Sequence, residues 1–402
     1  MPSIPHINTA EAGKTQPITP ILTMGFRVFF LSAGLWACIA MGLWLGWLNG
    51  WVALSSAFDP VSWHAHAFLF GFVSAVVAGF LLTAVPNWTG EPAMVGMPLL
   101  ALAIWWVIGR LATTFSFGLA APLVAALDVS FLIILAGVVT RSLIRSGNTR
   151  NLIVVSALVV LAAGNALFHY QAFRGGAAYQ GSGLRLGLSA TLLLIMIVGG
   201  RIVPNFTRNW LKQQGVSPML APGMQRYDQV VLLVSAGVLL VWTFMPTSVV
   251  CGPLLLAMAG LHFVRLSRWQ GHTTLAEPLV VVLHVAYAMV PLGALAIGLS
   301  ILLVAPDIAR GALHIWMVGA VVLMCLAVMT RATLGHSGQP LKAGAATVLI
   351  YAAILSAMAL RVCAVLWPVM APVLWTLSGL VWLLAFGLFV GFYAPLMLRK
   401  RT

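Results

Sequence analysis

Apolar residues in this chain gather in long runs separated by short polar segments. A helix needs about 20 mostly apolar residues to cross a bilayer, and the runs of that kind lie at approximately 24–48, 62–86, 95–115, 118–141, 151–171, 182–203, 227–245, 247–266, 278–304, 309–333, 344–366 and 371–397. The pattern predicts an all-α integral membrane protein with twelve transmembrane helices, in a single domain over residues 24–398. Residues 1–23 are polar and Pro-rich, without the basic and apolar regions of a signal peptide, so we expect a flexible cytoplasmic tail there.

Composition agrees with this prediction, because 61% of the residues are apolar and 7% are charged, against about 25% charged in soluble proteins. Twelve crossings place both chain ends on one side, and 16 of the 21 Lys and Arg residues fall on that side. Cytoplasmic loops collect Lys and Arg, so we expect both termini in the cytoplasm. The net charge of +14 then reflects topology and does not indicate a nucleic-acid partner. The four cysteines lie within apolar runs at long spacings, which indicates neither a disulfide framework nor a Cys metal motif.

The ends of two runs are similar in sequence. Val85-Pro86-Asn87-Trp88-Thr89 closes the second run, and Val203-Pro204-Asn205-Phe206-Thr207 closes the sixth, 118 residues later. The tenth run joins the series at a further 130 residues if Arg331 matches Arg201, which sets His66 against Leu184 and His314. This register predicts three four-helix repeats around a pseudo-threefold axis. The alternative is that Pro and an aromatic residue commonly end a membrane helix.

Four histidines are predicted to share the outer level of the membrane. His64 and His66 open the second run, His314 opens the tenth, and His169 ends the fifth. His64 and His66 point roughly 200° apart on a helix, so one metal cannot bind both without distortion. The nearest carboxylates in sequence are few, namely Asp59 and Asp307. We therefore expect haem iron or copper bound by nitrogen alone, with solvated interfacial histidines as the alternative.

Other polar residues fall in the cytoplasmic half. His284 and His336 are candidates to meet there, and Arg201 and Arg331 are candidates to hold a haem propionate or another anion, or lipid head groups. Tryptophans such as Trp36, Trp44 and Trp106 indicate packing or an interfacial belt. Only Asp128 among the seven acids lies in the middle of a run, which argues against a proton-coupled transporter.

Particular residues of this chain resemble the NnrS family of bacterial membrane proteins. The matching segments are Trp63-His64-Ala65-His66, Leu69-Phe70-Gly71-Phe72, Gly79 through Gly90, Gly200-Arg201, Pro204 through Asn209, Leu283-His284, Leu313-His314, and Met329-Thr330-Arg331 through Gly338. The resemblance runs from about Phe26 to the C-terminus. It implies a twelve-helix protein of the bacterial inner membrane that contains haem and copper and is linked to nitric oxide metabolism, nitrosative stress and denitrification.

The resemblance also implies a ligand set. By position, haem or copper ligands fall on His64, His66, His169, His284, His314 and His336. The four histidines predicted at the outer level, His64, His66, His169 and His314, are the candidate metal site. The haem would be non-covalent haem b, since the chain has no Cys-x-x-Cys-His segment. The family usually has Glu-Met directly after the second histidine, whereas this chain has Ala67-Phe68. Any role of that Glu as proton donor or ligand partner is then lost or relocated here.

Four functions are open from the sequence. The first is an oxidoreductase that binds nitric oxide and reduces or detoxifies it, with an unidentified electron donor; such an apolar substrate enters from the lipid bilayer. The second is a non-catalytic nitric oxide sensor or a protein that handles copper or haem. The third is a diverged haem-copper oxidase relative, which the Leu184 at the repeat position disfavours. The fourth is a small-molecule transporter.

Overall fold

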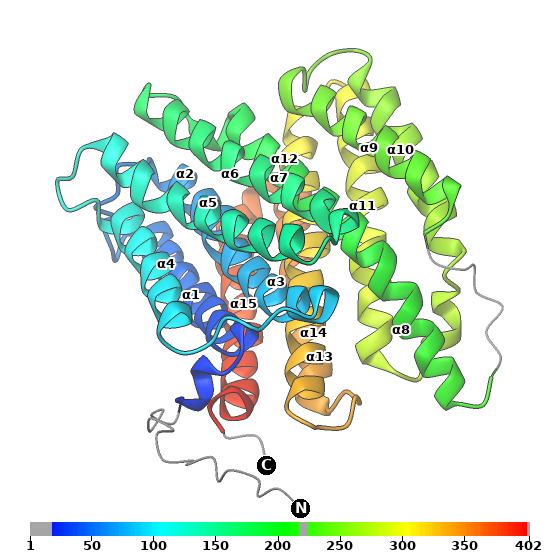
Figure 1. Ribbon diagram of the computed structural model, residues 1–402. Coiled ribbons are helices and arrows are strands. Elements are labelled where there is room, and N and C mark those ends of the chain that lie inside the picture. Colours follow the sequence, from blue (N-terminus) through cyan, green and yellow to red (C-terminus); the bar gives the residue numbers. More distant parts are fainter. Residues whose placement is uncertain (1–17, 217–223, 400–402) are drawn as a thin grey trace, which may run out of the picture.

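The computed structural model describes residues 18–216 and 224–399, and these fold into helices (Figure 1). Eleven helices are long and apolar enough to cross a membrane, and α10, the eighth predicted run, is shorter. The prediction of an all-α membrane protein is confirmed, while the count of twelve crossings stays a prediction. The uninterrupted helices are α1 (Gly25–Leu48), α4 (Met97–Phe115), α5 (Ala121–Arg145), α6 (Leu152–Phe173), α9 (Arg226–Phe244), α10 (Cys251–Ser267), α11 (Pro278–Leu302), α14 (Ala345–Leu366) and α15 (Ala371–Leu398).

Three further long helices each contain a π-helical stretch, a wider turn that is common at functional sites. They are the second, sixth and tenth predicted runs, whose ends the sequence repeat relates. Their parts are α2 (Pro60–His66), η2 (Ala67–Phe72) and α3 (Val73–Thr89); α7 (Ser182–Leu194), η5 (Ile195–Gly199) and α8 (Gly200–Gln213); and α12 (Pro306–His314), η7 (Ile315–Val322) and α13 (Leu323–His336).

The π-helical stretches of the second and tenth runs start at matching positions. Each begins directly after a histidine that the repeat register pairs, His66 in one and His314 in the other. In the sixth run the stretch begins at Ile195, well after the matched Leu184. The second and tenth runs therefore share more local structure with each other than with the sixth. The three-repeat arrangement itself stays a prediction.

Buried tryptophans support the π-helical turn of η2. The indole N–H of Trp36 donates to the carbonyl oxygen of Ala67 over 2.8 Å, and that of Trp106 donates to the carbonyl oxygen of Gly71 over 3.2 Å. A buried carbonyl group that lacks a regular helical partner is costly unless another donor reaches it. These two tryptophans therefore serve packing, as the sequence indicates, and also stabilise an irregular turn beside His66.

The two ends of the described chain lie at the same end of the bundle. Figure 1 shows α1 beginning and α15 ending there, and Arg27 Nη1 donates to the carbonyl oxygen of Met397 over 3.1 Å. This agrees with an even number of crossings. Residues 1–17 of the tail predicted for residues 1–23 lie outside the described residues.

A buried polar network joins α9, α10 and α11 away from the outer histidines. Arg265 Nε donates to Asp228 over 2.8 Å, and Arg265 Nη1 donates to the hydroxyl of Tyr287 over 2.7 Å. The hydroxyl of Tyr287 lies 2.9 Å from Nδ1 of His262, and Nε2 of His262 lies 2.8 Å from the hydroxyl of Ser235. Because that hydroxyl donates to a backbone carbonyl, His262 donates from Nε2 and accepts from Tyr287. Both ring nitrogens of His262 are thus used in hydrogen bonds within this network.

Candidate metal centres

The short helix α2 places two histidines on opposite sides of one turn. Asp59 starts this helix, because its carboxylate accepts hydrogen bonds from the backbone N–H groups of Val61 (3.1 Å) and Ser62 (3.0 Å). His66 then faces α5 and α6, whereas His64 faces a pocket bounded by α1, α12 and α14. The prediction that the two histidines point apart is confirmed, and each belongs to a separate centre.

His66 belongs to a buried group that we call the carboxylate–histidine cluster: His66, Arg110, Asp128, Asn165 and His169. Nε2 of His66 and Nε2 of His169 lie 3.0 and 2.9 Å from the same carboxylate oxygen, Oδ2 of Asp128. Asn165 donates its amide to that oxygen over 2.8 Å, and Arg110 forms an ion pair with the other oxygen. Each of these side chains is at most 7% exposed. The helices α2, α4, α5 and α6 thus converge on one carboxylate.

Charge in this cluster is balanced within the protein. The guanidinium of Arg110 offsets the carboxylate of Asp128, and the two imidazoles and the amide give the carboxylate further donors. A buried carboxylate is costly in a membrane unless it is paired and hydrogen-bonded in this way. Nδ1 of His66 is buried and has no hydrogen-bond partner among the described residues. One imidazole nitrogen is therefore left for a ligand or for water.

The donor atoms of the cluster fit a metal ion. One ligand atom each from His66, Asp128 and His169 lie within 4.8 Å of one another, and all three side chains are buried. Two imidazoles with one carboxylate can bind iron, copper or zinc. The expectation of nitrogen ligands alone stays a prediction, but a carboxylate is available at this centre, because Asp128 of α5 lies beside His66 and His169. The position of Asp128 in the middle of an apolar run indicates a functional residue, but spacing along the sequence does not reveal which side chains it contacts.

His64 and His314 line a second centre, which we call the histidine pocket. It holds about 600 Å³ of empty space between its side chains and at its mouth, and it is lined by His64, His314, Arg361 and aromatic and apolar side chains. The ring of His64 stacks on that of Trp44, with centroids 4.1 Å apart. Trp44 therefore lines a candidate site in addition to packing, which its sequence position did not indicate.

Hydrogen bonding leaves a free nitrogen on His314. Its Nδ1 lies 3.0 Å from the carbonyl oxygen of Arg310. A carbonyl only accepts, so Nδ1 carries the proton and Nε2 keeps its lone pair, as in many histidine ligands of metals. Nδ1 of His64 is buried without a hydrogen-bond partner among the described residues.

The residues of the histidine pocket fit a haem. The imidazoles of His64 and His314 would bind the haem iron. The rings of Trp44, Phe68 and Trp382 form apolar walls of the pocket, and Arg361 supplies a cation for a propionate. Phe68 has its ring 5.1 Å from that of His64 and 5.0 Å from that of Trp382, so it shapes this wall.

His284 and His336 contact different neighbours. Nε2 of His284 lies 2.8 Å from the hydroxyl of Thr207, and Nδ1 is buried without a hydrogen-bond partner among the described residues. The ring of His336 stacks on Phe26 of α1, with centroids 5.3 Å apart. The pairing of His284 with His336, expected from their predicted depth, stays a prediction.

Neither predicted anion-binding arginine lines a histidine centre. Arg201 Nη1 donates to the side-chain oxygen of Asn151 over 2.7 Å, and the guanidinium of Arg331 lies 4.1 Å from the ring centroid of Phe206. Arg361 of α14 is the arginine in the histidine pocket. It lies outside the sequence motifs, so only the packing of α14 against α12 reveals it.

The model of the family described as NnrS protein matches residues 20–401, nearly the whole chain. The chain belongs to the NnrS family. No curated protein matches it in sequence. The structure shows that this member of the family has many apolar helices and a His–Asp–His group able to hold a metal.

Proposed function

We propose that this NnrS-family protein holds haem b and copper, binds nitric oxide and reduces or detoxifies it with electrons from an unidentified donor. One observation carries the proposal: a single turn of α2 sends His64 into the histidine pocket and His66 into the carboxylate–histidine cluster. Two metal centres would therefore lie on opposite sides of one helix. The proposal includes a bacterial inner-membrane location, twelve crossings and both termini in the cytoplasm.

Each centre suits a different group. His64, His314 and Arg361 would hold haem, because they combine axial ligands and a cation in a pocket with aromatic walls. His66, Asp128 and His169 would hold copper, because their three ligand atoms converge in a small buried space. When bound, haem iron and copper supply sites for nitric oxide and a path for electrons. Reduction to nitrous oxide consumes two molecules of nitric oxide, two electrons and two protons and releases one water.

The chain's own residues set the conditions for this chemistry. Arg110 and Asn165 hold the carboxylate of Asp128, so its orientation does not depend on a metal. The contact of His314 with the Arg310 carbonyl keeps the proton off Nε2. Burial of the carboxylate–histidine cluster keeps bulk water away from that centre, which favours an apolar gas over polar ligands.

Metal analysis of centre-specific variants tests the proposal. We expect purified protein to show a Soret band and to contain copper. His314→Ala should lower the haem content and leave copper in place, whereas His169→Ala should lower the copper content and leave haem in place. His272→Ala is the matched control, because His272 is exposed on the short 3₁₀ helix η6 (Gly271–Thr274) and should change neither. A colourless wild-type protein, or loss of both groups in every variant including the control, contradicts the assignment.

A turnover assay separates the enzyme from a sensor or a metal-handling protein. Under anaerobic conditions with an artificial reductant, we expect nitrous oxide to form, with two nitric oxide molecules consumed for each. Nitric oxide binding that shifts the Soret band without forming nitrous oxide would instead support a sensor.

A further inference from the structure

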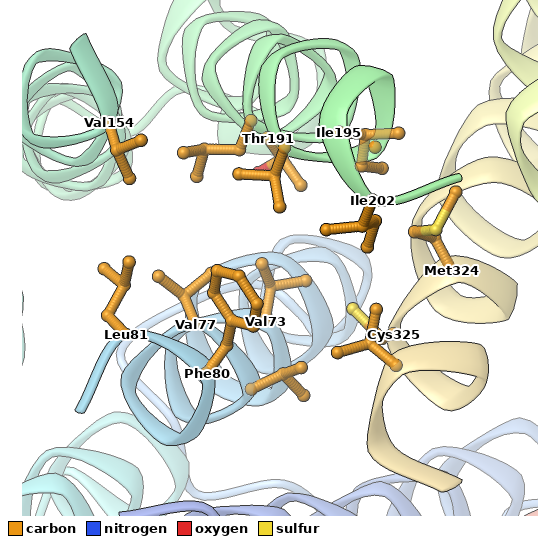
Figure 2. Close-up of a pocket in the computed structure, with 15 residues that line it drawn as sticks. Val73, Val77, Phe80, Leu81, Val154, Thr191, Ile195, Ile202, Met324 and Cys325 are labelled. Carbon is orange, nitrogen blue, oxygen red and sulfur yellow. The ribbon is translucent and has the colours of Figure 1, made fainter. Parts of the chain in front are cut away.

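A second cavity lies in the middle of the bundle, between the three helices that contain π-helical stretches. It holds about 620 Å³ of empty space between its side chains and at its mouth. Figure 2 shows side chains of α3, α7, η5, α8 and α13 pointing into it, with Val154 of α6 beside them. The helices concerned are well buried, with 83%, 72% and 67% of the most apolar window inside the protein for Pro60–Thr89, Ser182–Gln213 and Pro306–His336. The cavity therefore lies between well-buried helices and opens at its mouth, where half-buried side chains such as Phe80 and Val328 line it.

The wall of this cavity offers no polar contact to a ligand. Its lining is aliphatic, aromatic or sulfur-containing except for Thr191, as Figure 2 shows for Val77, Phe80 and Met324. The hydroxyl of Thr191 donates to the carbonyl oxygen of Gly187 over 2.9 Å. Cavities lined by apolar groups stay dry and bind apolar atoms and molecules. Ions and polar molecules are thus excluded as occupants.

Phe70 separates the cavity from the carboxylate–histidine cluster. Gly187 lies one turn from Thr191, and a Cβ atom there would come within 2.5 Å of the Phe70 ring, so this ring packs directly on the α7 backbone. On its other side the ring lies 5.3 Å from the His66 ring and 5.6 Å from that of Phe168, between centroids. Val73, one turn after Phe70, lines the cavity. A molecule that leaves the cavity past Phe70 meets His66.

We propose that this cavity binds an uncharged apolar diatomic gas and supplies it to the carboxylate–histidine cluster past Phe70. A gas of this kind dissolves in the lipid bilayer and needs no hydrogen bond, which matches a wall without polar contacts. A lipid acyl chain matches the wall less well, because every lining residue is buried or half-buried and none is exposed. The identification of the gas as nitric oxide rests on the proposed function. The uptake of apolar atoms by the cavity does not depend on that function.

Xenon tests the cavity directly, since it is apolar and needs no metal centre to bind. In crystals of the purified full-length protein under xenon pressure, we expect an anomalous peak between Val198 and Val328. Val198→Phe and Val328→Phe fill the space from two different helices, and each should abolish the peak. Val234→Phe is the matched control, a half-buried valine outside the cavity, and should retain it. Wild-type crystals without xenon at this position, or with an acyl chain filling it, overturn the proposal.

A rate measurement tests delivery. In protein loaded with its metals, Val198→Phe should slow nitric oxide binding several-fold without changing the metal content, and Val234→Phe should not. Equal rates in all three proteins overturn the delivery role. Xenon in the cavity of a protein that contains neither haem nor copper would refute the proposed function and leave the cavity's ligand class standing.

Discussion

The Nε2 atom of His169 lies 2.9 Å from the carboxylate oxygen Oδ2 of Asp128, although 41 residues separate them in sequence. The same oxygen faces His66 and Asn165, and Arg110 pairs with the other oxygen. One carboxylate therefore organises four side chains from three other helices.

Replacing Asp128 should affect both stability and metal content. Asp128→Asn leaves the buried guanidinium of Arg110 without its counter-charge, and loss of one partner of a buried ion pair costs about 3–5 kcal/mol. We expect a lower midpoint of thermal unfolding in detergent and reduced copper content. Asp307→Asn breaks the exposed pair with Arg310 and should change stability by less than about 1 kcal/mol. Equal unfolding midpoints for the two variants would contradict the role given to Asp128.

Replacing Arg361 should weaken haem binding without removing its ligands. Arg361→Gln deletes the cation that lines the histidine pocket. A hydrogen bond to a charged group contributes about 1.5–3 kcal/mol, so haem affinity should fall about tenfold or more. Haem titration of the apoprotein measures this. Arg201→Gln and Arg331→Gln should leave haem affinity unchanged, and a larger effect of either would restore the assignment made from sequence.

Gly71 is expected to tolerate no larger side chain. A Cβ atom at this position would come within 2.6 Å of Arg110 Nη1 and 2.8 Å of Trp36 Nε1, so Gly71→Ala displaces groups that support the cluster. Overpacking of this kind costs about 1–3 kcal/mol. Gly137→Ala is the control, since open space surrounds that position on α5. It should leave stability unchanged or raise it by up to about 1 kcal/mol. Thermal unfolding of the two variants should therefore shift in different directions or by clearly different amounts.

Replacing Tyr287 tests whether the polar network of α9, α10 and α11 is structural. Tyr287→Phe removes the hydroxyl that accepts from Arg265 and donates to His262, and unsatisfied buried partners cost about 1–3 kcal/mol. We expect a lower unfolding midpoint with unchanged haem and copper contents. Tyr170→Phe, at an exposed tyrosine, should match the wild type in both measurements. Loss of either metal group in Tyr287→Phe would place this network in a functional site.

Local patterns in the sequence predict a large part of this architecture. Hydropathy alone places most of the helices to within a few residues, because each helix satisfies its own backbone and needs only length and apolar side chains to cross a bilayer. The sixth run is the exception, since its polar continuation keeps α8 helical to Gln213, beyond the predicted end at residue 203. Helical periodicity alone separates His64 from His66. The end-of-run similarity singled out the three helices that contain π-helical stretches, although it did not predict the stretches themselves.

The members of each centre were decided by tertiary packing. Asp128 and Arg361 are single polar residues in apolar helices, and no spacing along the chain indicates which histidine each one approaches. His284 and His336 share a predicted depth, yet their side chains turn to different neighbours. The depth of a side chain in the membrane follows from its position along one helix. The direction in which it points depends on how that helix is oriented about its axis against its neighbours. The sequence thus determined the class of protein, the order of its helices and the level of its histidines, and the packing of the bundle decided which side chains meet.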